Sequence, residues 1–266
     1  MSFYAAVLDA ARAEHGLEVD HRILVVCGGP LDRDQLLAAG FTDVVVSNLD
    51  DRMSGDAYAP YGWSYQDAEQ LDLPDGSFDW VVVHAGLHHC VSPQKALAEM
   101  LRVARRGIVA VEARDSLAMR LAVRLGLTDE YEVEAVVDNG GAFGGVANSA
   151  VPNFVYRWTE REVRKAVACA DPGRDHDVAF RYDWRAPVER LAMSASPARR
   201  ALAGPLRLVC ALGRHLAPRQ GNCFAFVVRH RDELKPWLRR DGDDVVFDRE
   251  WASRHYRTRD AAGTAG

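Results

Sequence analysis

Two adjacent histidines, His88 and His89, stand just after the apolar run FDWVVVHAG. An imidazole with an unperturbed pKa near ~6.5 can take up a proton at neutral pH, so each is a candidate general base. Glu112 ends the run GIVAVEA and is a third candidate, because burial raises the pKa of a carboxylate toward useful values. Structural roles are the alternatives: a hydrogen-bonded histidine pair, and a Glu112 that pairs with Arg114 or caps a helix.

Metal binding is another interpretation of this stretch, because His84 and Cys90 stand close to the two histidines. The spacing of these four residues is not that of a known zinc pattern. No second cluster in the sequence completes a tetrahedral site. We therefore expect no metal ion.

The segment VPNFVYRWTE gathers polar and aromatic side chains. Asn153, Tyr156 and Arg157 offer groups that suit the binding of a sugar or a polyketide-like ring. A solvent-facing segment with Trp158 in the core is the alternative. The preceding stretch is rich in glycine, and its residues 140–145 are candidates for a mobile gate.

A turn with two glycines follows the apolar run RILVVC. Gly28 and Gly29 allow the backbone to approach a ligand closely, because a Cβ there would collide with it. Neither G-x-x-x-x-G-K-[ST] nor G-x-G-x-x-G is present. Asp32 and Asp34 would also repel a pyrophosphate. The turn favours a ligand with a cationic part and no phosphate, and a tight turn without any ligand is the alternative.

Two further polar positions could contact such a ligand. Asn48 lies 20 residues after the first glycine of the turn, about where a ribose-binding acid stands in doubly wound folds. Its amide oxygen can accept a hydrogen bond, and Asp50 or Asp51 could serve instead. Asp67 can accept from an exocyclic amine, and Ala68 leaves room for a flat base. For Asn48, Asp50 and Asp51 the alternative is an ordinary loop residue without a ligand.

Strands and helices must bring these residues together. Strands that alternate with helices in the first half predict a parallel sheet covered on both faces. Ligands of such sheets bind at the carboxyl ends of the strands, where the candidates stand. Two helix starts are predicted, one by Ser92 with Pro93 and one by Thr159 with Glu162. The composition of residues 51–64 predicts a loop. The apolar patterns predict strands at 22–27, 43–48, 78–86, 107–113, 177–184 and 222–230, and helices at 3–15, 32–40, 92–105, 159–170 and 195–217.

The order of these features resembles the class I S-adenosylmethionine-dependent methyltransferases. The similarity spans roughly residues 20–115. Its most specific part is DAEQLDLPDGSFDWVVVHAGLHH, which is similar to the D-A-x-x-L-P-F … F-D-x-V-x-S-x-x-x-L-H-H motif of the broad small-molecule group. The glycine turn departs from the usual hhDhGCGxG, with Val25 in place of the acid and Leu31 in place of the last glycine.

The resemblance implies a Rossmann-like α/β fold. Its seven-stranded sheet would be mostly parallel, with NCFAFVVRH as an antiparallel last strand and with helical lid insertions. It also implies S-adenosyl-L-methionine as the cofactor, which has a sulfonium, an ammonium and a carboxylate but no phosphate. The turn would hold the amino-acid end of the cofactor, Asn48 the ribose, and Asp67 with Ala68 the adenine. The implied cofactor-binding residues are Cys27, Gly28, Gly29, Asn48, Leu49, Asp67, Ala68 and His84.

Composition argues against several other classes of protein. The chain has 266 residues, 48% of them hydrophobic, which suffices for a large buried core. A net charge of −5 argues against sequence-independent binding of nucleic acid. Five cysteines without a CxxC pair favour reduced thiols. No run reaches the roughly 20 apolar residues of a membrane span, so we expect a cytoplasmic protein without one.

We expect a single methyltransferase domain at residues 1–260. Its cofactor-binding core would be 20–115, and residues 1–19 and 116–220 would supply substrate lid elements. The small polar tail, 261–266, should be disordered.

The expected activity is methylation of a hydroxyl on a small molecule, such as a sugar or a secondary-metabolite unit. Oxygen is preferred because base candidates are present and no NPPY-type motif stands at the third predicted strand. A non-catalytic cofactor-binding module is the alternative, since the glycine turn is altered. A nicotinamide-dependent oxidoreductase is disfavoured, because its glycine pattern and a Tyr-x-x-x-Lys pair are missing. A homodimer is considered for the assembly.

Overall fold

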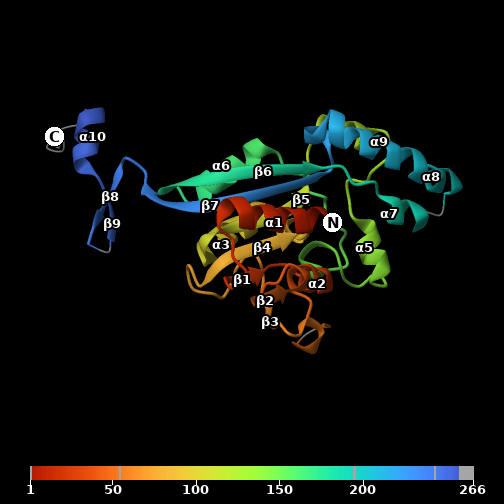
Figure 1. Ribbon diagram of the computed structural model, residues 1–266, viewed down its shortest axis with the longest axis horizontal. Helices are drawn as coiled ribbons and strands as arrows, with labels where there is room; N and C mark the ends of the chain where they lie inside the picture. Colours follow the sequence, from red (N-terminus) through yellow and green to blue (C-terminus); the bar gives the residue numbers. More distant parts are fainter. Residues whose placement is uncertain (1, 54, 194–195, 243, 258–266) are drawn as a thin grey trace, which may run out of the picture.

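The computed structural model describes residues 2–53, 55–193, 196–242 and 244–257. Its centre is a seven-stranded sheet in the order β3-β2-β1-β4-β5-β7-β6 (Figure 1). The first five strands in this order pair in parallel, and β7 runs antiparallel to both of its neighbours. The predicted fold class is therefore confirmed. The strands are β1 Arg22–Val25, β2 Asp43–Asn48, β3 Gly62–Tyr65, β4 Phe78–His84, β5 Ala104–Ala113, β6 Arg174–Asp183 and β7 Cys223–Leu234.

Alternate residues of the central strands pack on opposite faces of the sheet, and helices cover both faces. Leu24 and Val81 join a buried cluster with α3 and α6 on one face. Ile23 and Trp80 join a second cluster with α1 and α2 on the other face. The helices are α1 Phe3–His15, α2 Pro30–Ala38, α3 Pro93–Val103, α4 Leu117–Arg124, α5 Val133–Asp138, α6 Glu160–Ala170, α7 Val188–Met193, α8 Pro197–Ala201, α9 Ala203–Leu216 and α10 Arg249–His255.

Local signals in the sequence set the starts of two of these helices. The Ser92 hydroxyl accepts a hydrogen bond from the Lys95 backbone N–H at the start of α3. Thr159 and Glu162 form the predicted capping box at the start of α6. Both predicted starts are confirmed, because a side-chain oxygen satisfies an otherwise free N–H at each. None of the described helices is both long and apolar enough to cross a membrane.

Two predicted segments have a different secondary structure, and α4, α5, α7, α10, β8 (Leu238–Asp241) and β9 (Asp244–Phe247) lie where no element is predicted. The short strand β3 overlaps the end of 51–64, where the composition predicts a loop. β3 pairs only with β2 at the edge of the sheet and has no fully buried residue, so it lacks the apolar run of an inner strand. The single helix predicted at 195–217 is instead two helices, α8 and α9, which meet at Leu202.

Segments outside the central sheet gather at two ends of the molecule. Helices α5, α7, α8 and α9, from the expected lid segment 116–220, lie at one end (Figure 1). The same segment also supplies β6 and α6, which belong to the sheet and its cover. Helix α1 buries Val7 and Leu8 in the core. The hairpin β8 Leu238–Asp241 and β9 Asp244–Phe247 stands with α10 at the opposite end (Figure 1). The expected disordered tail lies outside the described residues.

Candidate active site

A pocket of about 350 Å³ lies at the carboxyl ends of β1, β2 and β4, and we call it the strand-end pocket. Its volume falls within the range of small-molecule sites. Five of the eight predicted cofactor residues line it, and Gly28, Gly29 and His84 do not. The lining residues are Cys27, Asn48, Leu49, Asp50, Arg52, Met53, Gln66, Asp67, Ala68, Glu69, Ala85, His89, Cys90, Asn139, Gly144, Gly145, Ala147 and Asn148.

The glycine turn is shaped by packing between strand ends. A Cβ on Gly28 would stand 2.6 Å from Cγ1 of Val46, so packing against the neighbouring strand β2 favours glycine here. Gly29 begins α2 and has nothing within 4 Å of an added Cβ. Cys27 adopts a left-handed conformation with φ 52°, which brings its side chain to the pocket. Asp32 is buried and accepts a hydrogen bond from the Gly29 N–H, so it caps α2.

His84 also lies apart from the strand-end pocket. Its ring stacks on that of Tyr4 with centroids 4.5 Å apart and an angle of 5° between the ring planes. Tyr4 is buried at the start of α1, so the two rings join this helix to the end of β4. Burial lowers the pKa of His84, and the imidazole is held neutral at pH 7.

Acidic side chains dominate the polar lining of the strand-end pocket. Asp67 accepts a hydrogen bond from the Glu69 N–H, and Glu69 in turn accepts from backbone N–H groups of the segment that leads to α3. Asp50 pairs with Arg52, and the hydrogen bonds from Arg52 lower the pKa of Asp50. Asn48 donates to the Gly28 carbonyl and accepts from the Asp50 N–H. Three acids against one arginine favour a ligand with cationic groups.

The glycine-rich loop over residues 139–148 closes one side of the strand-end pocket. Arg52 donates to Asn139 Oδ1 at 3.1 Å, and its guanidinium lies 4.3 Å from the ring centroid of Phe143. Asn148 donates to the Leu49 carbonyl at 3.4 Å. A Cβ on Gly145 would stand 1.9 Å from the Val151 carbonyl oxygen, so the loop fold requires glycine there. The loop is thus tied to the polar segment after β2.

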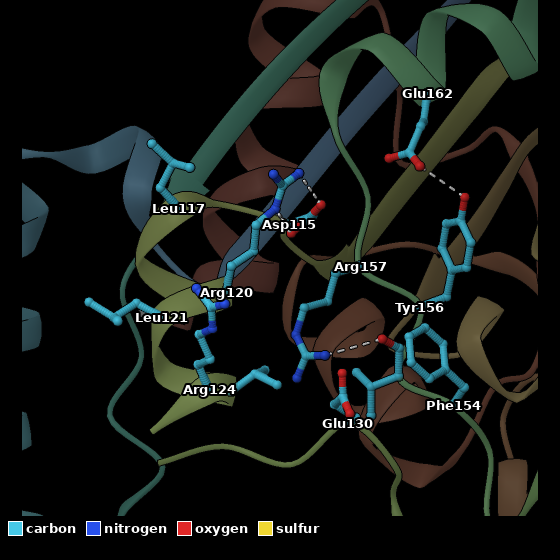
Figure 2. A pocket seen from close by; sticks show the side chains of 12 residues that line it. Asp115, Leu117, Arg120, Leu121, Arg124, Glu130, Phe154, Tyr156, Arg157 and Glu162 are labelled. Carbon is cyan, nitrogen blue, oxygen red and sulfur yellow. Dashed lines mark hydrogen bonds and ion pairs between the residues drawn. The ribbon is translucent and has the colours of Figure 1, made fainter. Parts of the chain in front are cut away.

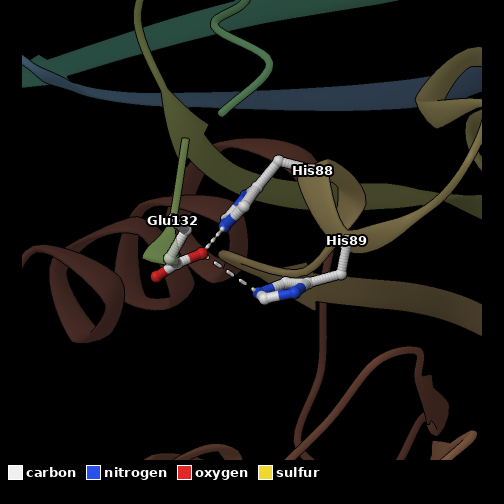
Figure 3. A group of neighbouring side chains, drawn as sticks. All are labelled: His88, His89 and Glu132. Carbon is white, nitrogen blue, oxygen red and sulfur yellow. Dashed lines mark hydrogen bonds and ion pairs between the residues drawn. The ribbon is translucent and has the colours of Figure 1, made fainter. Parts of the chain in front are cut away.

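Four ionisable residues lie beside this pocket, and one of them, His89, lines it. We call them the His–Glu cluster: His88, His89, Glu112 and Glu132. Glu112 is fully buried, and its Oε1 accepts from the backbone N–H groups of Gly86 and Leu87. Its Oε2 lies 3.0 Å from Nδ1 of His88, whose Nε2 lies 3.2 Å from Oε2 of Glu132. Nε2 of His89 lies 3.4 Å from the same oxygen (Figure 3).

The cluster assigns different charge states to its two histidines. Burial disfavours the charged form of His88, but the charge and hydrogen bond of Glu112, together with Glu132, raise its pKa to about 10. The hydrogen bond from His88 lowers the pKa of Glu132 to about 2. Burial, and then the charge on His88, lower the pKa of His89. At pH 7 His88 is therefore an imidazolium, and His89 is neutral and able to accept a proton.

Ligand atoms of His88, His89 and Glu132 all lie within 4.8 Å of one another, a separation that a divalent metal could bridge. Each of these side chains already interacts with an oppositely charged or hydrogen-bonding member of the His–Glu cluster. These interactions already engage all three side chains with one another and with Glu112.

A second pocket of about 250 Å³, the lid pocket, lies on the other side of the His–Glu cluster. His88 and Glu132 line it together with Arg157, and His89 lines the strand-end pocket instead. Most of the remaining lining is apolar and comes from α4, α9 and the segments beside them. These residues are Ala113, Met119, Ala122, Leu127, Thr128, Val155, Trp184, Arg185, Pro187, Leu206, Val209, Cys210 and Asn222.

Two of the three predicted substrate residues share an open groove beside α4, and the third is buried. Arg157 lines both this groove and the lid pocket, and it donates to the Asp129 carbonyl at 2.8 Å (Figure 2). Tyr156 lines the groove alone and points to Glu162, with which it forms a hydrogen bond (Figure 2). Asn153 is buried, and its amide donates to Glu132 at 3.4 Å. Only Arg157 therefore faces the lid pocket, and Asn153 orients Glu132.

Residues 25–111 match the family model described as a methyltransferase domain. This match covers about a third of the chain, and it supports the resemblance to the class I S-adenosylmethionine-dependent methyltransferases. The chain is similar in fold to the YcgJ protein of Bacillus subtilis, with a TM-score of 0.51 and 13% sequence identity; the similarity covers 89% of this chain and 99% of that one. It is also similar to a structure of the Haloferax volcanii Trm112 methyltransferase activator in complex with a methyltransferase, with a TM-score of 0.50 and 14% sequence identity. That similarity covers 84% of this chain and 87% of the other. None of the curated proteins is significantly similar to the chain.

Residues of the matched segment supply most of the lining of the strand-end pocket, and the loop over residues 139–148 supplies the rest. The match supports S-adenosylmethionine as the cofactor. Two residues that complete the site, Arg52 and Glu132, have no signal in the sequence. Glu132 stands in TDEYEVEA among several acids without a distinctive spacing. Only the folded chain places it between the two histidines.

Proposed function

We propose that this methyltransferase transfers a methyl group to a hydroxyl oxygen of a small molecule, with a sugar or a secondary-metabolite unit as the acceptor. The observation that supports the proposal is the His–Glu cluster, which lies between the strand-end pocket and the lid pocket. A hydroxyl must lose its proton during methyl transfer, and a neutral histidine at this boundary can take it.

S-adenosylmethionine supplies an already activated methyl group on its sulfonium. The acids that line the strand-end pocket suit the sulfonium and ammonium of this cofactor, and the pocket contains no phosphate-binding lysine. Asp67 and Ala68 border the region that we assign to adenine, and Asn48 with Asp50 the region of the ribose. Methyl transfer then requires mainly that the acceptor oxygen be aligned and that water be excluded.

We assign the role of general base to His89, because it is neutral at pH 7 and lines the strand-end pocket. His88 is already protonated and cannot accept a proton. Glu112 has no exposed side-chain surface and reaches neither pocket, so it is a positioning residue that orients His88. Glu132 hydrogen-bonds to His88, and the same carboxylate lies 3.4 Å from Nε2 of His89 and stabilises the imidazolium that forms there.

The apolar lining of the lid pocket favours an acceptor with an apolar body over an unsubstituted sugar. Arg157 and Arg185 add cationic groups at the same pocket, which suit a carboxylate or phosphate substituent on the acceptor. A secondary-metabolite unit with one anionic group meets both requirements. We also propose a cytoplasmic location, supported by the five cysteines, all of which are free.

Incubation of the protein with methyl-labelled S-adenosylmethionine and an extract of its host tests this proposal. We expect one small molecule to gain a labelled methyl group on oxygen, and the His89→Ala variant to produce much less of it. A label on nitrogen or carbon would contradict the O-methylation. Binding of S-adenosylhomocysteine without any labelled product would instead favour a non-catalytic module.

A further inference from the structure

A second cluster of ionisable side chains lies on strands β6 and β7, away from the strand-end pocket. Asp171 directly follows α6, His176 lies on β6 and His230 lies on β7. The two histidines are direct partners in the antiparallel register, so their side chains stand on the same face of the sheet. Their ring centroids are 5.2 Å apart. We call these three residues the β6–β7 cluster.

The histidines of the β6–β7 cluster are buried without adequate hydrogen bonds. Their side chains are only 4% and 8% exposed. Nε2 of His176 and both ring nitrogens of His230 form no hydrogen bond of good geometry among the described residues, although Nε2 of His176 lies 3.3 Å from Oδ2 of Asp171. Buried polar atoms in native proteins nearly always have a well-placed partner, so these three poorly satisfied nitrogens at one place indicate a missing ligand.

The separations of the donor atoms match a metal site. Oδ2 of Asp171 lies 3.3 Å from Nε2 of His176 and 3.9 Å from Nδ1 of His230. All three ligand atoms lie within 4.8 Å of one another. Ligand atoms bound to tetrahedral zinc at ~2.0–2.1 Å stand about 3.4 Å apart. Small side-chain shifts would therefore bring all three into coordination.

We propose that Asp171, His176 and His230 bind a zinc ion, with one water as the fourth ligand. Two imidazole nitrogens and one carboxylate oxygen form a donor set that zinc prefers, whereas magnesium and calcium select oxygen ligands. Nε of Arg174 lies 3.6 Å from the same oxygen, Oδ2 of Asp171, so this contact would move to the other carboxylate oxygen when zinc binds. The ion would tie the end of α6 to the edge strand β6 and to β7, so its role is structural.

The test is calorimetric titration of zinc into the full chain after treatment with a chelator. We expect the wild-type chain to bind a zinc ion at this cluster. His230→Gln and Asp171→Asn should weaken that binding more than about 10-fold. Both variants nearly preserve side-chain volume, and Asp171 is partly exposed, so these chains should fold. Zinc should also raise the melting temperature of the wild type and not that of His230→Gln.

Two matched controls exclude other ligands. Cys169 is an exposed thiol two residues before Asp171, and His89 belongs to the separate His–Glu cluster. Cys169→Ser and His89→Ala should each bind zinc at the β6–β7 cluster as the wild type does. The proposal is overturned if the wild type takes up no zinc, if His230→Gln and Asp171→Asn bind it equally well, or if either control abolishes the binding.

Discussion

At the scale of single residues, the two adjacent histidines take opposite charge states because of their neighbours. His88 stands between two carboxylates and remains protonated, whereas His89 is close to that positive charge and partly buried. Adjacent positions in the sequence therefore serve different purposes. One histidine holds the network together, and the other is free to accept a proton.

Replacement of His89 by alanine tests its assignment as the base. We expect kcat to fall by about 100-fold, the lower range for loss of a general base. The affinity for S-adenosylhomocysteine should stay within about twofold, because His89 contributes only one of the many side chains that line the strand-end pocket. Single-turnover kinetics and calorimetry measure the two quantities. An unchanged kcat would show that His89 is not the general base.

The pH profile of kcat separates the members of the His–Glu cluster. The charge on His88 lowers the pKa of His89, and the charge on Glu132 raises it. His88→Gln should therefore move the acidic limb of the profile to higher pH, and Glu132→Gln should move it to lower pH. Shifts in the same direction, or none, would show that His89 does not titrate in this limb. Binding of S-adenosylhomocysteine by each variant confirms that it is folded.

At the scale of elements, the loop over residues 139–148 decides access to the strand-end pocket. Gly145→Ala would place a Cβ against the Val151 carbonyl oxygen and should displace the loop. We expect the affinity for S-adenosylhomocysteine to fall by about 10-fold, equivalent to roughly 1.4 kcal/mol. Gly204→Ala on α9 is the matched control, because its Cβ would meet nothing within 4 Å. Equal affinities for the two variants would show that the loop does not contribute to the site.

Strands and helices with strong local signals could be predicted from the sequence. The apolar run of β4 and the capping box of α6 mark these elements, and each depends on residues close together in the chain. Strand β3 could not be predicted, because its pairing with β2 supplies the stability that its own residues lack. The same holds for Glu132, whose role depends on two histidines more than 40 residues away.

The glycine turn shows a further limit of the sequence. The sequence suggests that Gly28 allows a close approach to a ligand. In the structure, contact with Val46 on the next strand also favours glycine at this position. Cys27 contributes to the strand-end pocket through a left-handed backbone that its residue type does not reveal. Both facts depend on how β1 and β2 lie side by side.

At the scale of the whole molecule, the His–Glu cluster links stability to pH. The pKa of His88 rises from 6.5 to about 10 on folding, so its contribution is full below pH 6.5 and is lost as the pH rises through about 10. The pKa of Glu132 falls from 4.5 to about 2, so its contribution is full above pH 4.5 and is lost as the pH falls through about 2. Both contributions to stability are full between pH 4.5 and 6.5, whereas the charged forms of His88 and Glu132 persist in the folded chain from about pH 2 to about pH 10.

We therefore expect His88→Gln to cost about 3 kcal/mol of unfolding free energy near pH 6, the typical cost of breaking a buried ion pair. The difference from the wild type should shrink by pH 10. Urea unfolding at the two pH values measures it. A difference that grows with pH would mean that His88 is not protonated in the native state.

The central claim is that the strand-end pocket binds the adenosyl cofactor of the methyltransferase domain. Calorimetric titration of S-adenosylhomocysteine into the wild type, Asp67→Ala and Asp51→Ala tests it most directly. Asp67 lines the strand-end pocket, whereas the neighbouring acid Asp51 is exposed and does not. We predict saturable binding to the wild type, at least about 10-fold weaker binding to Asp67→Ala and little change for Asp51→Ala. Absence of heat at millimolar ligand with folded protein, or equal losses in both variants, would contradict the account.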